Sequence, residues 1–305
     1  MATLDRIAPS NANTRTDVIG EKPPNVVESA TRATSVAPRK ITAVDTLDDF
    51  DHRPTTLDGT TKTVHVTGTG PAVIVMAEMP GISPQVARFA RWVRDAGFTA
   101  YLPSLFGRDG AVPDADEGLA VARRACMSKE FRAFANQGSS PVTRWLMSLA
   151  RQAHAECGGP GVGAIGMCFT GNFALTMMLE PAVLAPVLAQ PSLPLDDPAG
   201  LEIAPDELQA VRTRLNRDNL TVLAYRFQGD KICTAQRFAA YTEALGNRFV
   251  ARELPDDVNP NVPPFFATHV NYPHSVVTVH LVDEAGHPTT TARDEILTFF
   301  QSRLT

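Results

Sequence analysis

The sequence Gly166-Met167-Cys168-Phe169-Thr170-Gly171 lies between a short apolar run, residues 162–165, and a nearly all-apolar stretch, residues 173–179. The run predicts a buried strand and the stretch predicts a helix, so the six residues between them form a tight strand-to-helix turn. Such a turn strains the backbone of its central residue and requires small flanking residues. The pattern resembles Gly-x-Ser-x-Gly with Cys168 replacing serine, and it predicts a nucleophile at Cys168.

The alternation of strand and helix continues on both sides of this turn. Residues 72–76 form an apolar run typical of a strand buried on both faces, and Ser83-Pro84 predicts the start of a helix that Gly97 ends. Other strands are predicted at residues 61–66, 98–102, 183–188, 221–227 and 276–282, and other helices at residues 116–126, 141–156, 205–214, 234–245 and 293–303. The order predicts an α/β fold, a doubly wound, mostly parallel sheet with helices on both faces.

The composition indicates one globular domain with an extension. Residues 1–45 are rich in small and polar residues without a sustained period, which predicts a mobile extension, and residues 46–305 are predicted to form a single domain. The net charge of -5 argues against nucleic acid or an anionic membrane as a partner. The four cysteines have no framework spacing, and no apolar stretch reaches membrane-spanning length. We therefore expect a cytoplasmic protein with reduced thiols, and its oligomeric state stays open.

Cys168 has two interpretations. At a helix N-terminus, the partial positive charge of the helix would stabilise a thiolate, as catalysis requires. The alternative is a buried packing residue, because free cysteine is among the most buried residue types. The strand–turn–helix context favours the nucleophile. The remaining cysteines, Cys126, Cys157 and Cys233, lack this context and are interpreted as packing residues.

A histidine base and an acid follow the nucleophile in the chain order of α/β-hydrolases. The histidines beyond Cys168 are His269, His274, His280 and His287. We favour His287, because it lies in a glycine-containing loop directly after a predicted strand, where catalytic loops gather. His280 falls inside that strand, and the other two fall in a segment without helix or strand period. A solvated loop histidine is the alternative for His287.

Asp230 is the predicted acid, because it follows the strand at 221–227 and reaches the same sheet edge. It would fix the imidazole tautomer and stabilise the imidazolium. A helix cap for the segment from Thr234 is the alternative role, and Asp283 and Glu284 are rival acids.

Two backbone N–H groups would form an oxyanion hole. One is expected from Phe169, after the nucleophile, and the other from Met79, in the loop after the strand at 72–76. Glu78 is an unusual charge directly after a buried strand. It is either a solvated loop carboxylate or a carboxylate of the site.

With these residues identified, the chain from about Val73 onward resembles the dienelactone hydrolase family. The resemblance is based on residues 73–81, 100–105 and 166–171, and on the turns Gly229-Asp230 and Gly286-His287. It implies a Cys168-Asp230-His287 triad and a glutamate near the nucleophile at Glu78.

The sequence departs from this family at three positions. Thr170 replaces a glycine of the turn, and Ser104 replaces an aspartate. Family members that open dienelactones have an arginine shortly after the histidine, whereas residues 288–292 contain none. Arg123 and Arg124 are alternative substrate-binding residues. We therefore expect the substrate, and not the fold, to differ.

The expected activity is that of a carboxylic ester hydrolase of the carboxymethylenebutenolidase type, acting on a small ester or lactone. No metal or organic cofactor is expected, because metal-ligand spacings, phosphate-binding loops and dinucleotide motifs are missing from the sequence. A thioesterase or broad carboxylesterase with the same triad is one alternative. A catalytically inactive binding module with the same fold is the other.

Overall fold

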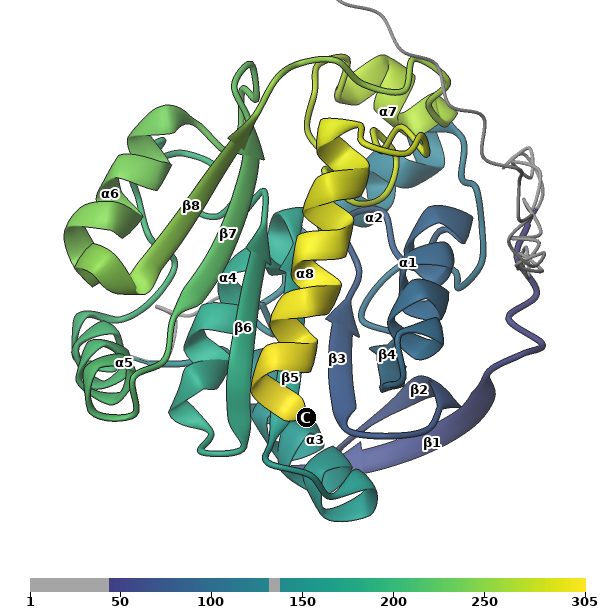
Figure 1. Cartoon of the computed structure of the whole chain (residues 1–305). Helices are drawn as coiled ribbons and strands as arrows, with labels where there is room; N and C mark the ends of the chain where they lie inside the picture. The colour runs from purple at the N-terminus through teal and green to yellow at the C-terminus, as the bar shows by residue number, and fades with distance from the viewer. Residues whose placement is uncertain (1–43, 132–137) are drawn as a thin grey trace, which may run out of the picture. The chain divides into compact units, whose positions relative to one another are not determined.

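An eight-stranded sheet runs through residues 44–131 and 138–305, which the computed structural model describes (Figure 1). The strand order is β1-β2-β4-β3-β5-β6-β7-β8. The strands are β1 (Asp51–Leu57), β2 (Thr60–Gly68), β3 (Ala72–Met76), β4 (Thr99–Pro103), β5 (Val162–Met167), β6 (Val183–Ala189), β7 (Val222–Phe227) and β8 (Phe249–Leu254). β2 pairs antiparallel with β1 and β4, and the other pairs are parallel. The predicted doubly wound, mostly parallel sheet is confirmed.

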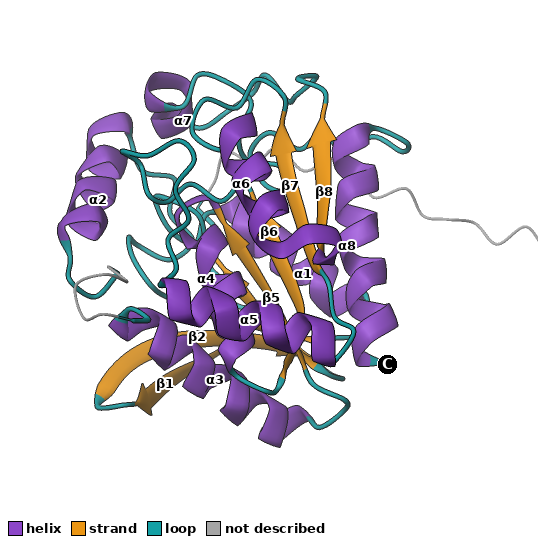
Figure 2. Ribbon diagram, turned by 90° about the vertical axis from the view of Figure 1, so that its left-hand side faces the viewer, coloured by secondary structure: helices purple, strands orange, loops and turns teal. Residues whose placement is uncertain are grey.

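Helices cover both faces of this sheet (Figure 2). They are α1 (Pro84–Asp95), α2 (Ala115–Met127), α3 (Pro141–Cys157), α4 (Gly171–Thr176), α5 (Pro205–Arg217), α6 (Ala235–Leu245), α7 (Pro264–His269) and α8 (Pro288–Leu304). Apolar residues of α1 and α8 form one core cluster with the sheet, and those of α3, α4, α5 and α6 belong to the other. Strands covered on both faces have no solvated side, which is why β3, β4, β5 and β7 are buried along their whole length.

The segment at 276–282 was predicted to be a strand, and this prediction is wrong. Residues 276–280 form turns, and the edge of the sheet is instead β8, which the sequence did not reveal. Val277 and Val279 have the spacing of a strand but do not share a face, because Val277 packs into one core cluster and Val279 into the other. The backbone N–H of Val276 donates to the side chain of Gln190. The segment therefore connects the two cores without pairing as a strand.

The predicted mobile extension at 1–45 lies outside the described residues, except for its last two. Of these, Asp45 belongs to the packed domain, because its carboxylate accepts two hydrogen bonds from Arg91. Its backbone N–H also donates to the carbonyl of Gly110.

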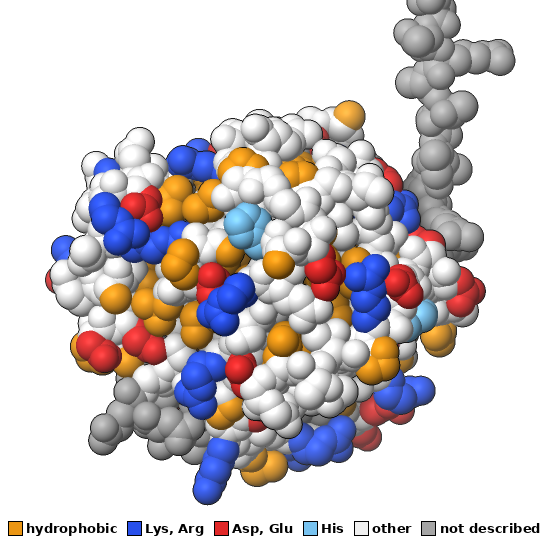
Figure 3. Space-filling view, turned by 90° about the horizontal axis from the view of Figure 1, so that it is seen from below, with side chains coloured by type: hydrophobic (Ala, Val, Ile, Leu, Met, Phe, Trp, Pro, Cys, Tyr) orange, Lys and Arg blue, Asp and Glu red, His pale blue; other side chains and the backbone are white. Residues whose placement is uncertain are grey.

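Acidic and basic side chains are interspersed on the face seen from below (Figure 3). Within the described ranges, no helix is both long and apolar enough to cross a membrane.

Candidate active site

The Cys168 turn joins β5 to a short 3-10 helix, Cys168–Thr170, that leads into α4. Cys168 has a φ of 54°, a left-handed conformation that is rare and strained for a residue with a side chain. The turn is too tight for larger neighbours: a Cβ on Gly166 would lie 2.0 Å from the carbonyl oxygen of Thr170. A Cβ on Gly171 would lie 2.5 Å from Cα of Pro191. The structure thus has the strained turn that the sequence predicted.

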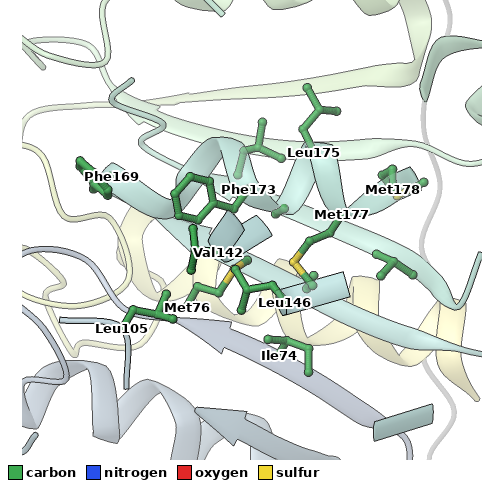
Figure 4. Close-up of a cluster of buried hydrophobic side chains, with 14 of the residues drawn as sticks. Ile74, Met76, Leu105, Val142, Leu146, Phe169, Phe173, Leu175, Met177 and Met178 are labelled. Carbon is green, nitrogen blue, oxygen red and sulfur yellow. The ribbon is translucent and has the colours of Figure 1, made fainter. Parts of the chain in front are cut away.

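Thr170, the residue that replaces a glycine, locks this turn. Its fully buried hydroxyl accepts a hydrogen bond from the backbone N–H of Met167. The hydroxyl lies 3.0 Å from the carbonyl oxygen of Met167, 3.1 Å from that of Met76 and 3.2 Å from that of Ala77, any one of which can accept its single proton. The threonine therefore ties the nucleophile turn to the end of β3 and to the loop that contains Glu78. Figure 4 shows the apolar side chains packed around this part of the fold.

Asp230 is buried in the loop after β7, and His274 is its histidine partner. Oδ2 of Asp230 lies 2.8 Å from Nδ1 of His274. Oδ1 accepts hydrogen bonds from the backbone N–H groups of Ile232 and Cys233, both at 2.9 Å. With one oxygen held by the backbone, the other is fixed toward the imidazole. Helix α6 is capped by Thr234, so the alternative role of Asp230 as that cap is wrong.

The imidazole of His274 lies close enough to Cys168 for the charge of the cysteine to act on it. Nε2 is buried and has no partner in full hydrogen-bonding geometry among the described residues. Burial disfavours the imidazolium, but the charges of Asp230 and Cys168 and hydrogen bonding to both outweigh it. Together they raise the pKa of His274 well above its ordinary value. Catalytic hydrogen bonds are often incomplete without substrate, so the loose contact at Nε2 is consistent with a base.

His287, the predicted base, lies elsewhere. It is the N-cap of α8, where its Nδ1 is 2.8 Å from the hydroxyl of Thr289. Its Nε2 lies 3.5 Å from Oδ2 of the exposed Asp257. The pairing of His287 with Asp230 is therefore corrected to His274. His287 was preferred because it was expected to lie in a loop directly after a strand. That strand does not form.

His280 holds the backbone of His274 in place. Its Nδ1 accepts hydrogen bonds from the N–H groups of His274, at 3.3 Å, and of Ser275, at 3.0 Å. Accepting at Nδ1 requires a neutral ring. Burial, followed by the nearby charge of His274, lowers the pKa of His280 to about 4 and keeps it neutral.

Glu78 is a fully buried carboxyl group rather than a solvated one. Its Oε2 accepts a hydrogen bond from the hydroxyl of Ser275 at 2.6 Å and from the amide of Gln190 at 3.2 Å. Its Oε1 accepts from the hydroxyl of Thr278. Desolvation is the largest influence on Glu78 and raises its pKa. The side chain thus connects the loop after β3 to the segment that follows His274 and to Gln190, in the loop after β6.

Met79 and Phe169, the expected oxyanion-hole residues, are both buried. The ring of Phe169 contacts the rings of Phe106 and Phe131, with centroids 6.0 and 5.5 Å apart. These rings form an apolar wall directly beside the nucleophile turn.

A model of the dienelactone hydrolase family matches residues 58–246, well over half of the chain. The chain belongs to the dienelactone hydrolase family. The matched range includes Cys168 and Asp230 but ends before His274 and His287, so the choice between these histidines depends on the geometry above.

Two solved structures show the same fold. One is a dienelactone hydrolase-like promiscuous phosphotriesterase, P91, from metagenomic libraries, with 18% identity and a TM-score of 0.57. The match covers 84% of this chain and 100% of that one. The other is a Klebsiella pneumoniae protein assigned as a dienelactone hydrolase, with 16% identity and a TM-score of 0.52 over 83% of this chain and 98% of that one. A search of curated protein sequences finds no match.

The family's substrate arginine is also missing after His274. The five residues that follow, Ser275 to Val279, contain no cation, and Thr278 among them binds Glu78. The two candidate arginines, Arg123 and Arg124, are both exposed on α2. Arg124 lines two neighbouring cavities of about 320 and 230 Å³. The smaller one is also lined by Phe106 and Phe131, which places Arg124 near the aromatic wall.

Sequence reasoning missed two further residues near the site. Burial, followed by the charges of Asp230 and Cys168, raises the pKa of the half-buried Tyr272 to about 12. The ammonium group of Lys231 lies 5.3 Å from the centre of the Tyr272 ring. Neither residue belongs to a motif, so only the fold reveals them.

Proposed function

We propose that this member of the dienelactone hydrolase family hydrolyses a small ester or lactone through Cys168, His274 and Asp230. The observation that supports it most is the buried Asp230–His274 pair beside a cysteine in left-handed backbone geometry. A strained nucleophile, a base and an orienting acid are the three parts of an acyl-transfer triad.

In the first half of the reaction, the thiolate of Cys168 attacks the carbonyl carbon, and the carbonyl π electrons move to oxygen. The backbone N–H groups of Met79 and Phe169 stabilise that oxyanion. The oxyanion re-forms the carbonyl, the carbon–oxygen bond of the ester breaks, and the His274 imidazolium gives its proton to the departing oxygen. Cys168 is then acylated as a thioester.

In the second half, neutral His274 takes a proton from water, and the water oxygen bonds to the acyl carbon. When the tetrahedral intermediate collapses, the carbon–sulfur bond breaks and its electron pair returns to the sulfur of Cys168. Asp230 holds Nδ1 of the imidazole throughout, so that Nε2 faces the reacting groups.

Glu78 has a positioning role in this proposal. Its three hydrogen bonds go to Ser275, Thr278 and Gln190, and none of these residues is a reacting group. It keeps the segment that directly follows His274, and the loop of Gln190, attached to the loop that contains Met79.

The deciding experiment measures hydrolysis of aryl esters and small lactones by the wild type and by Cys168→Ala. Cys168→Ala should lose hydrolysis completely while remaining folded, and Cys157→Ala, at the end of α3, is the matched control. A Cys168→Ala variant with near wild-type turnover would disprove the proposal. A wild type that binds these compounds without hydrolysing them would favour the inactive binding module, and preferred turnover of acyl thioesters would favour the thioesterase.

A further inference from the structure

Ser192 contacts the sulfur of Cys168, and the reaction described above gives it no role. Its hydroxyl oxygen lies 3.4 Å from the sulfur, and its side chain is 1% exposed. Burial of a polar side chain costs free energy unless it is hydrogen-bonded, so the buried hydroxyl of Ser192 requires a hydrogen-bond acceptor.

The loop holding Ser192 is fixed from several directions. The backbone N–H of Ser192 donates to the carbonyl of Cys168 itself, at 3.0 Å. The carbonyls of Pro191 and Pro194 accept hydrogen bonds from the buried guanidinium of Arg237. The hydroxyl therefore approaches Cys168 from a preorganised backbone, and its position needs no rearrangement when substrate binds.

The hydroxyl has a single proton and two acceptors. One is the sulfur of Cys168, and the other is the carbonyl oxygen of Gln190, 3.0 Å away. A neutral thioether or thioester sulfur is a weak acceptor, so the proton then favours the carbonyl. A thiolate is a charged acceptor, and hydrogen bonds to charged groups are roughly twice as strong as neutral ones.

We infer that Ser192 is a further catalytic residue, which donates a hydrogen bond to the thiolate of Cys168. It acts twice in each cycle: on the thiolate before attack, and on the sulfur as the carbon–sulfur bond of the thioester breaks and the electron pair returns. Between these points the hydroxyl turns back to the carbonyl of Gln190. The inference rests on the proposed role of Cys168 as the nucleophile.

The test measures how fast iodoacetamide labels Cys168 between pH 4 and pH 10, with peptide mass mapping to separate it from the other three cysteines. Only the thiolate reacts, so the midpoint of the rate against pH reports its stabilisation. Ser192→Ala should move the midpoint upward by about one pH unit and slow labelling about tenfold at pH values below both midpoints. Ser148→Ala, on the exposed side of α3, is the matched control and should coincide with the wild type.

A purely structural Ser192 would lower the melting temperature without moving the midpoint, and an unchanged midpoint in folded Ser192→Ala overturns the inference. If Ser192→Ala does not fold, Ser192→Cys keeps the volume with a weaker donor and must shift the midpoint in the same direction. An unshifted Ser192→Cys overturns the inference equally. Labelling needs no turnover, so this result is separate from the loss of hydrolysis in Cys168→Ala.

Discussion

His274 and His287 both follow Cys168 in the chain and both precede α8, but their surroundings differ. His274 is 1% exposed, pairs with a buried carboxylate, and has a second histidine holding its backbone. His287 caps a helix through Thr289, and its acidic neighbour, Asp257, is open to solvent. The position of a histidine after Cys168 in the chain therefore narrows the choice of catalytic base. The buried acid that pairs with the imidazole, and the packing around it, decide that choice.

After the two histidines themselves, the two acids give the largest expected difference. Asp230→Asn should lower kcat by about 10³- to 10⁴-fold, because the amide favours the wrong imidazole tautomer at His274. Asp257→Asn, the matched change beside His287, should leave kcat within about twofold, since solvent-exposed pairs contribute little. Steady-state kinetics of both variants on one aryl ester make the comparison. Equal losses would remove the distinction between the two histidines.

Low pH should destabilise the region around His274, because it protonates His280. The folded state holds the pKa of His280 at about 4, below the ordinary 6.5, so the unfolded state binds more protons between these values. The free energy of unfolding should therefore fall as pH drops from about 6.5 to 4, by roughly 3 kcal/mol from this group. Asp49, with its pKa lowered to about 2, loses its contribution at lower pH.

Urea unfolding at several pH values isolates this effect. His280→Gln should be less stable than the wild type at neutral pH and have a shallower slope between pH 6.5 and 4. His154→Gln, at the end of α3, is the control and should keep the wild-type slope. An unchanged slope in His280→Gln would show that the ring does not stay neutral in the folded protein.

Glu78→Gln should have a smaller effect on stability. The amide nitrogen of glutamine accepts no hydrogen bond, so at least one of the three buried hydrogen bonds to Glu78 is lost, at about 1–3 kcal/mol. Loosening the His274 segment should also lower kcat more than it raises KM. Glu284→Gln, in the exposed loop before His287, is the matched control. Thermal melts and kinetics should separate the two, and identical melting temperatures would contradict a tethering role for Glu78.

Most of the fold was predictable because helix and strand periods are local. The turn at Cys168 was predictable too, since its glycines and flanking apolar runs lie within twenty residues. The catalytic histidine was not predictable, because it depends on the path of residues 255–287. The apolar residues in this stretch have the spacing of a strand, but they contact two different core clusters and form no strand. Asp230 was predictable because it directly follows β7, whereas Ser192 and Tyr272 belong to loops without any periodic signal.

The smallest expected effect concerns the preference between neutral and anionic substrates, and it depends on the residues that follow each histidine. Neither Ser275 to Val279 after His274 nor Pro288 to Ala292 after His287 includes an arginine. Each missing charge-assisted hydrogen bond to a substrate carboxylate forfeits about 1.5–3 kcal/mol. Neutral esters or lactones should therefore be hydrolysed at least as well as anionic dienelactones. Values of kcat/KM for an acid and its methyl ester test this, and a hundredfold preference for the acid would contradict it.

The most direct test of the account is the turnover of His274→Ala and His287→Ala measured side by side on one ester. His274→Ala should lose at least about 10⁴-fold in kcat, because losing the base disables the whole triad. His287→Ala should retain kcat within about threefold and lose only helix-cap stability of about 1 kcal/mol. A His287→Ala variant that is inactive, together with an active His274→Ala, would contradict the assignment of His274 as the base for Cys168.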